Sequence, residues 1–247
     1  MIIHLEGCNF EQLELSSCLN LKRIKLDRGI TLQPNAFHGL SQLNELELVD
    51  CKCEQLDLSS CLNLERNKLS RGITLQRNAF HGLAQLKELE LVDCKCEQLD
   101  LSSYHNLESI GLCGEGITLQ PNGFHGLSQL EILKLEGCKL KQLDLSSCHN
   151  LERIKLRGEG ITLQLNALHG LAQLYILELE GCKCEQLDLS SCHNLEGIIL
   201  LGEGITLQLN AFHGLAQLKI LRLEGCKCEL LDLSSCNNLE NIELSGG

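Results

Sequence analysis

The feature that most constrains this chain is an internal repeat that runs through its whole length. The segment QLDLSSC, or a close variant, begins near residues 12, 55, 98, 142, 186 and 230, so it returns every 43 or 44 residues. A second segment, GITLQ followed by a variable residue and Asn, returns at the same period and begins at Gly29, Gly72, Gly116, Gly160 and Gly204. A fixed period of about 20 to 50 residues is typical of solenoids and propellers.

Each period contains two shorter leucine-rich units. The first, as in residues 86–94, reads L-x-x-L-x-L-x-x-C, and the second, as in residues 107–112, reads L-x-x-I-x-L. The first unit is 21 residues long and the second is 22 or 23. Alternating leucines point to one face of a strand, and a single unit cannot bury that face alone. The pattern therefore predicts about twelve stacked units that form a parallel sheet.

The repeats resemble the leucine-rich repeat (LRR) family along the whole chain. The 22- or 23-residue unit resembles the animal-type repeats of Toll-like receptors, variable lymphocyte receptors and LRR-only immune proteins. This resemblance implies a curved horseshoe solenoid, with about twelve parallel strands on its concave face and short extended, 3-10 or helical-turn segments on its convex face. It also implies that one aromatic or aliphatic slot packs inside the convex wall, namely Phe37, Phe80, Phe124, Leu168 and Phe212.

We expect a single LRR domain over residues 1–247, with no visible cap at either end. Uncapped ends suggest a fragment of a longer receptor or end-to-end self-association. On the convex side we expect extended pieces at LDL and ITL. We also expect a short helical turn at AFHGLxQL, started by an Asn such as Asn122 or Asn210.

The 16 cysteines occupy three repeated slots, apart from Cys113, which stands alone on a strand facing the presumed binding surface. The strand-end slot holds Cys where the LRR family has its ladder Asn. The other two slots also accept Phe10, Leu140 and Tyr104, so they are apolar, and Cys there acts as a small buried hydrophobe. We predict mainly free thiols, with a bridge inside one unit, such as Cys51 to Cys61, left open. Free thiols slightly favour a cytoplasmic location, and a secreted or cell-surface location stays open for a fragment.

Metal binding and catalysis find little support. A cluster such as Cys182, Cys184, Cys192 and His193 resembles a ligand set, but C-x-C is tight for a zinc pair and two of its slots accept apolar residues. No catalytic set stands out from the repeated background, and the GEGIT loops lack the context and the Lys of a phosphate-binding loop. We expect no metal, no cofactor and no enzyme activity.

The charge balance limits the partners. The chain has 33 acidic and 21 basic residues, a formal net charge of −12, which repels nucleic acid phosphates. No stretch approaches the roughly 20 apolar residues that a membrane span needs, so no membrane insertion of this chain is expected. The first ten residues lack the features of a secretory signal.

The copies differ mainly at the strand positions that point away from the leucine core. In the first third these positions alternate in charge between adjacent strands, which predicts a polar surface whose opposite charges pair with one another. In the last third they become aliphatic, and an apolar patch with a polar rim marks contact sites. The predicted ligand- or partner-binding residues on the concave face are Ile176, Glu178, Glu180, Gly197, Ile199, Leu201, Ile220, Arg222 and Glu224.

These observations predict a non-enzymatic recognition module that binds a protein or microbial macromolecule through its concave face. By resemblance, the setting is innate-immune pattern recognition by a receptor. The alternative is an intracellular scaffold or adaptor domain that binds a host protein.

Overall fold

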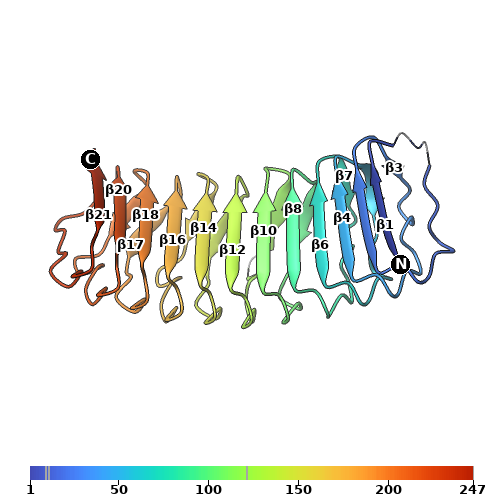
Figure 1. Ribbon diagram of the computed structural model, residues 1–247. Helices are drawn as coiled ribbons and strands as arrows, with labels where there is room; N and C mark the ends of the chain where they lie inside the picture. Colours follow the sequence, from blue (N-terminus) through green and yellow to red (C-terminus); the bar gives the residue numbers. More distant parts are fainter. Residues whose placement is uncertain (9, 11, 121, 247) are drawn as a thin grey trace. The chain divides into compact units, whose positions relative to one another are not determined.

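The computed structural model describes residues 1–8, 10, 12–120 and 122–246, which form two compact units, Met1–Gln120 and Pro121–Gly247. Each unit is a stack of coils, and each coil contributes one five-residue strand to a parallel sheet (Figure 1). This arrangement confirms the predicted solenoid with parallel strands. The single-domain assignment stays a prediction.

The long strands of the first unit follow one another in chain order across the sheet. They are β1 (Ile2–Glu6), β2 (Arg23–Asp27), β4 (Glu45–Val49), β6 (Arg66–Ser70), β8 (Glu88–Val92) and β10 (Ser109–Cys113). The long strands of the second unit are β12 (Ile132–Glu136), β14 (Arg153–Arg157), β16 (Ile176–Glu180), β18 (Gly197–Leu201), β20 (Ile220–Glu224) and β21 (Asn241–Ser245).

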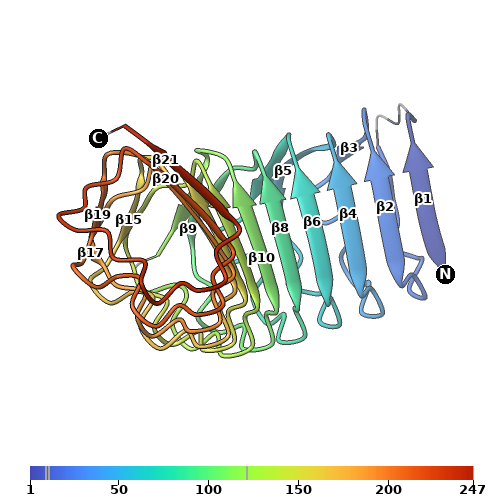
Figure 2. The ribbon, with the colours of Figure 1, turned by 60° about the vertical axis from the view of Figure 1, so that its left-hand side comes forward.

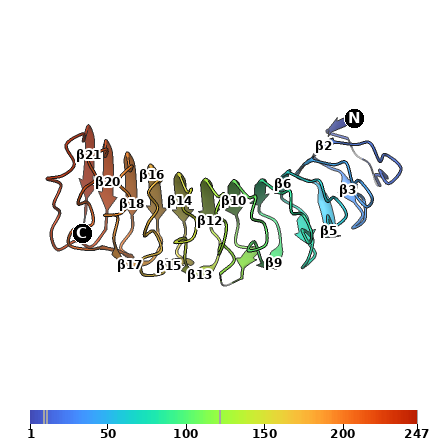
Figure 3. The ribbon, with the colours of Figure 1, turned by 90° about the horizontal axis from the view of Figure 1, so that it is seen from below.

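Short strands lie on the other side of the coils from the long ones (Figure 3). In the first unit they are β3 (Thr31–Leu32), β5 (Lys52–Leu56), β7 (Ile73–Leu75), β9 (Cys96–Leu99) and β11 (Ile117–Leu119). In the second unit they are β13 (Leu140–Leu143), β15 (Ile161–Leu163), β17 (Cys184–Leu187) and β19 (Ile205–Leu207). Figure 2 views the coils of the second unit nearly end on and places β17 and β19 away from β20 and β21.

The leucine core lies between the long and short strands. In register, Ile24 faces Leu46 and Leu26 faces Leu48, so equivalent side chains stack from coil to coil. These four side chains are at most 1% exposed. The stacked layers explain why aliphatic residues at period two suffice, since each coil buries its apolar face only against its neighbours.

The secondary structure on the short-strand side of the coils, which carries the Phe slot, differs in part from the prediction. The ITL strands form as expected. The other extended piece ends on the first residue of LDL, for example at Cys96–Leu99, where LDL occupies residues 99–101. The predicted helical turn is replaced by linked single turns, and the described part of the chain contains no helix. Asn122 is not a helix N-cap, because its φ of 63° lies in the left-handed region, and Gly126 follows with a φ of 79°. Two left-handed residues four positions apart interrupt any right-handed helix.

The predicted Phe slot is nevertheless buried as expected. Phe37, Phe80, Phe124 and Phe212 and the substituting Leu168 are all at most 4% exposed. With no helix in the described residues, that part of the chain also has no helical segment able to cross a membrane.

Candidate functional site

The nine predicted site residues lie on three neighbouring strands of the second unit, which pair in register. Along the first row, Ile176 of β16 faces Gly197 of β18, which faces Ile220 of β20. The second row is Glu178, Ile199 and Arg222, and the third is Glu180, Leu201 and Glu224. The structure therefore brings all nine side-chain positions together as a grid of three by three. We call this surface the strand patch.

The strand patch points away from the core. On each of the three strands the two intervening residues, such as Ile198 and Leu200, are buried, and the three patch residues are half-buried or exposed. Ile220 is 47% exposed, which is high for a large aliphatic side chain. When a partner covers aliphatic side chains that are in contact with water, the free energy of the complex is lowered.

The charges around the strand patch are paired with one another. Glu178 accepts from Lys155 at 2.6 Å, and Glu180 pairs with Arg157 at 2.9 Å. On the other side, Arg222 lies 3.3 Å from Glu224 and 3.4 Å from Glu243. The hydrogen bond to Glu178 raises the pKa of Lys155, so this ammonium group stays charged at neutral pH. The rim is thus a set of exposed ion pairs, each worth at most about 1 kcal/mol.

Two further side chains of the second unit extend the patch and escaped the sequence reasoning. Tyr175 precedes β16, and the guanidinium of Arg153 lies 5.0 Å from the centre of its ring. The Nε of Arg153 also donates to the Tyr175 hydroxyl. Ile132 on β12 is 40% exposed and lies in register with Arg153. The signal for Tyr175 was available, because most residues at the equivalent position before a long strand are charged, for example Glu196 and Lys219.

The same face of the first unit carries the charge pairs that the alternating sequence predicted. The ion pairs are Arg23–Glu45 at 3.2 Å, Lys25–Glu47 at 3.1 Å, Arg66–Glu88 at 3.0 Å and Lys68–Glu90 at 3.2 Å. Each joins residues in register on adjacent strands. The prediction of a polar surface whose opposite charges pair with one another is confirmed in this region.

Most cysteine slots are buried as predicted, and most of their thiols also donate hydrogen bonds, but Cys8, Cys18 and Cys226 are half-buried and Cys228 is exposed. Burial raises the pKa of the strand-end thiols Cys94 and Cys182 to about 12 and that of Cys51 to about 11. The Cys51 thiol donates to the Leu26 carbonyl at 3.6 Å, and the Cys94 thiol to that of Leu69 at 3.5 Å. At the position where the LRR family has its ladder Asn, the thiol therefore donates a hydrogen bond to the preceding coil. Cys113, predicted on the strand face, is half-buried at the end of β10.

The LSSC slot shows the same donor requirement. Cys61 donates to the Phe37 carbonyl at 3.5 Å, and Cys192 donates to that of Leu168 at 3.5 Å. Tyr104, which replaces Cys in this slot, donates from its hydroxyl to the equivalent carbonyl of Phe80 at 3.0 Å. The slot is therefore not simply apolar, since its occupant also supplies a donor to the preceding coil.

The glycines of the GEGIT loops are explained by coil packing. A Cβ on Gly204 would lie 2.7 Å from the Cys182 carbonyl oxygen, and one on Gly116 would lie 2.7 Å from that of Cys94. Gly202, which directly follows Leu201 of the strand patch, is also required by coil packing. Its φ is 128°, and its Cβ would lie 3.3 Å from the backbone of Gly181.

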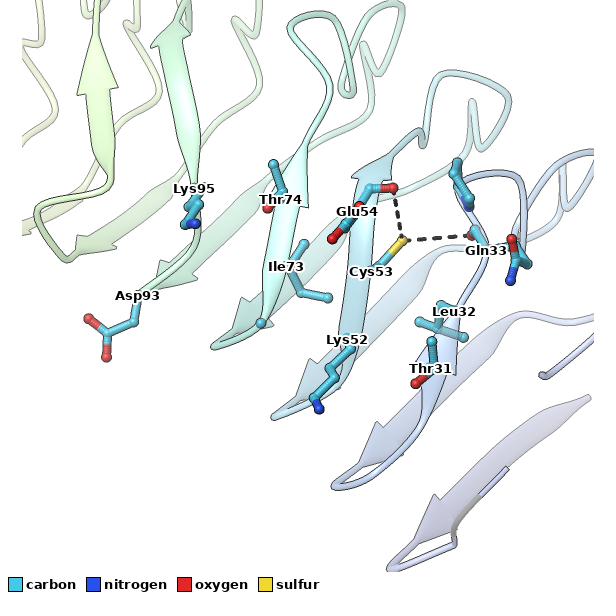
Figure 4. A pocket seen from close by; sticks show the side chains of 12 residues that line it. Thr31, Leu32, Gln33, Lys52, Cys53, Glu54, Ile73, Thr74, Asp93 and Lys95 are labelled. Carbon is cyan, nitrogen blue, oxygen red and sulfur yellow. Dashed lines mark hydrogen bonds between the residues drawn. The ribbon is translucent and has the colours of Figure 1, made fainter. Parts of the chain in front are cut away.

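A separate pocket of about 720 Å³ lies on the short-strand side of the first unit. Its lining comes from β3, β5, β7 and the approach to β9, and the Cys53 thiol inside it donates to the carbonyls of Gln33 and Glu54 (Figure 4). Thr31, Lys52, Thr74 and Lys95 line it from positions that recur in the other coils. This repetition indicates an architectural feature. Among the described residues, no group of three or more His, Cys, Asp or Glu side chains could hold a metal ion.

Comparisons with known proteins support the fold. Residues 9–131 match the BspA type leucine rich repeat region in six copies. Comparison with curated protein sequences gives no significant match. Several solved structures are similar in fold. The plant peptide hormone receptor RGFR1 in complex with RGF2 shares 14% identity at a TM-score of 0.75, over 99% of this chain and 47% of that one.

Two others come from an insect and a bacterium. The Toll–Spatzle complex of Drosophila shares 19% identity at a TM-score of 0.72, over 98% of this chain and 36% of that one. An internalin, InlF, from Listeria monocytogenes shares 16% identity at a TM-score of 0.66, over 94% of this chain and 76% of that one. The chain thus spans less than half of the two receptors. The stacked coils, the repeat match and these likenesses together place the chain in the leucine-rich repeat family.

Proposed function

We infer that this chain is a non-enzymatic recognition module that binds a protein ligand through the strand patch. The observation that carries this function is that the outward sheet face of the first unit differs in chemistry from the outward sheet face of the second unit. Cross-strand ion pairs occupy the face of the first unit, whereas the second unit presents, within a rim of ion pairs, the exposed Ile220 and the half-buried Ile176, Ile199 and Leu201. An apolar centre with a polar rim is the usual anatomy of a protein interface.

Proteins of similar fold support this class of partner. The plant receptor is in complex with the peptide hormone RGF2, and Toll is in complex with Spatzle. Because the repeats also resemble those of animal immune receptors, we extend the proposal to innate-immune recognition of a microbial ligand. The alternative is an intracellular scaffold that binds a host protein through the same patch. Binding to heat-killed bacteria, measured against binding to host cell proteins, separates the two settings. Self-association through the end coils stays a prediction.

The test uses random peptides displayed on phage and selected on the full chain. Ile199→Asp and Leu201→Asp should each weaken the selected peptides at least about tenfold, or about 1.4 kcal/mol, because a carboxylate must be desolvated inside the contact. Val92→Asp on β8 is the matched control, since it places the same carboxylate on the strand face of the first unit. Peptides that bind the Ile199 and Leu201 variants as well as they bind the parent chain would refute the proposed site.

A further inference from the structure

The middle strand of the strand patch begins with a glycine that the fold does not require. Gly197 lies on β18 between Ile176 on β16 and Ile220 on β20. A Cβ on Gly197 would meet, among the described residues, only the Cγ1 of Ile176, at 3.9 Å, an ordinary contact distance. Its backbone is in extended strand conformation. Unlike Gly202 and Gly204, it is held by neither a left-handed φ nor a close backbone neighbour.

The missing side chain leaves a notch on the sheet surface. Two isoleucines form its walls, and they stand about 10 Å apart because adjacent strands are about 4.8 Å apart. The half-buried backbone of Gly197 forms its floor, and Tyr175 lies immediately before Ile176 in the chain. Glycine weakens a strand relative to a β-branched residue, so the fold bears a cost at this position. One large apolar side chain from a partner fits a notch of this width and chemistry.

The opposite end of β18 is flanked by two carboxylates. Leu201 lies between Glu180 and Glu224 in register, about 13 Å from Gly197 along the strand. Glu180 is paired with Arg157 and Glu224 with Arg222. Each carboxylate offers about four acceptor sites, so both have room for a further donor placed over Leu201. The net charge of −12 also attracts a basic partner over distance.

We propose that the strand patch binds an extended basic segment of a protein ligand, which inserts one large apolar side chain into the Gly197 notch and places a Lys or Arg between Glu180 and Glu224. The two side chains stand four residues apart in an extended segment that runs along β18, because each residue advances about 3.3 Å and every second side chain faces the sheet. This inference rests on the proposed function and names the partner of that site.

The experiment again uses random peptides displayed on phage and selected on the full chain, in low salt. Selected sequences should share a large aliphatic or aromatic residue and a Lys or Arg four positions away. Gly197→Ile fills the notch and should weaken these peptides at least about tenfold. It should also raise the urea midpoint of the chain, because a β-branched residue suits a strand better than glycine. A structural defect would instead lower both binding and stability.

Two controls make the test specific. Gly111→Ile alters the strand glycine of β10, whose Cβ would lie 3.5 Å from the Glu90 side chain, and should leave peptide affinity unchanged. The double variant Glu180→Gln and Glu224→Gln should weaken peptides that carry the basic residue and remove most of their salt dependence. Gly197→Ala, which adds one methyl group, serves if the isoleucine variant does not fold.

The outcomes separate this inference from the proposed function. If Ile199→Asp abolishes binding but Gly197→Ile does not, the patch is a binding site and the notch is refuted. If the selected peptides lack a basic residue at the required spacing, the two carboxylates have no role and the proposed partner chemistry is overturned. If Ile199→Asp has no effect, the proposed function itself fails.

Discussion

Replacing Asn67 by isoleucine is expected to stabilise the protein by about 4 kcal/mol. Asn67 lies on β6 at a position that points into the leucine core, between Leu46 and Leu89 in register. Its side chain is 2% exposed, and neither its Nδ2 nor its Oδ1 atom has a hydrogen-bond partner among the residues that the structure describes. A buried amide without partners costs about 1–3 kcal/mol. Burying isoleucine in its place gains about 1.5–3 kcal/mol.

The structure offers a close precedent for the replacement. Asn67 stands in the segment R-N-K-L, and the chain also contains R-I-K-L at residues 23–26 and 153–156. Ile24 and Ile154 are each 1% exposed at the equivalent positions. Isoleucine therefore fits this layer with the same neighbours in sequence, and little of the gain should be lost to strain.

Equilibrium unfolding in urea, followed by circular dichroism, gives the free energy of unfolding of each variant. Ile154→Asn is the matched reverse substitution in the second unit and should cost a similar amount. A stability gain below about 1 kcal/mol for Asn67→Ile would refute the reasoning, because it would mean that the amide is not an unpaired group in the folded protein.

Three other perturbations test the packing between coils. Gly204→Ala should destabilise by about 1–3 kcal/mol, because its Cβ would lie 2.7 Å from the Cys182 carbonyl oxygen, whereas Gly197→Ala should stabilise by about 0.5–1 kcal/mol, because its Cβ meets only an ordinary contact and alanine loses less backbone entropy than glycine. Equal effects of these two alanines, measured by urea unfolding, would contradict the close approach. Tyr104→Phe should cost about 1 kcal/mol, because the Phe80 carbonyl loses the hydroxyl donor and keeps the Leu83 amide, and an unchanged thermal midpoint would argue against that bond. Burial raises the pKa of Cys51 and Cys192 from the ordinary value of 9.0 to about 11, so the unfolded chain loses these protons first, and stability present below pH 9 should fall as the pH rises towards 11. Cys192→Ala should flatten that fall, and a urea midpoint that does not change between pH 9 and pH 11 would disprove it.

The repeat made the sheet predictable because every coil repeats the same alternation. The inward leucines, the outward charge pairs such as Arg23–Glu45 and the grouping of Ile176, Ile199 and Ile220 all follow from period two and from register. Turn geometry was less predictable, because Asn122 and Asn166 have a left-handed φ whereas Asn78 and Asn210, at the equivalent position of the same motif, do not. Asn67 was missed because a pattern averaged over copies hides a single exception. The thiol donors were missed because the slot also accepts apolar residues, and only Tyr104 shows that a donor is retained.

The contacts between coils alternate in kind along the stack. In the donor contact, a thiol or hydroxyl of a 21-residue unit reaches back to a carbonyl of the longer unit before it, as from Cys61 to Phe37. In the glycine contact, the longer unit packs closely against the 21-residue unit before it, as at Gly72 and Cys51.

The smallest modular insertion is therefore a pair of coils, not one. An in-frame duplication of 43 or 44 residues reproduces both contacts, whereas a duplication of one unit sets two like surfaces against each other. Selection can thus lengthen the sheet by whole pairs, and each new pair adds outward positions that are free to diverge.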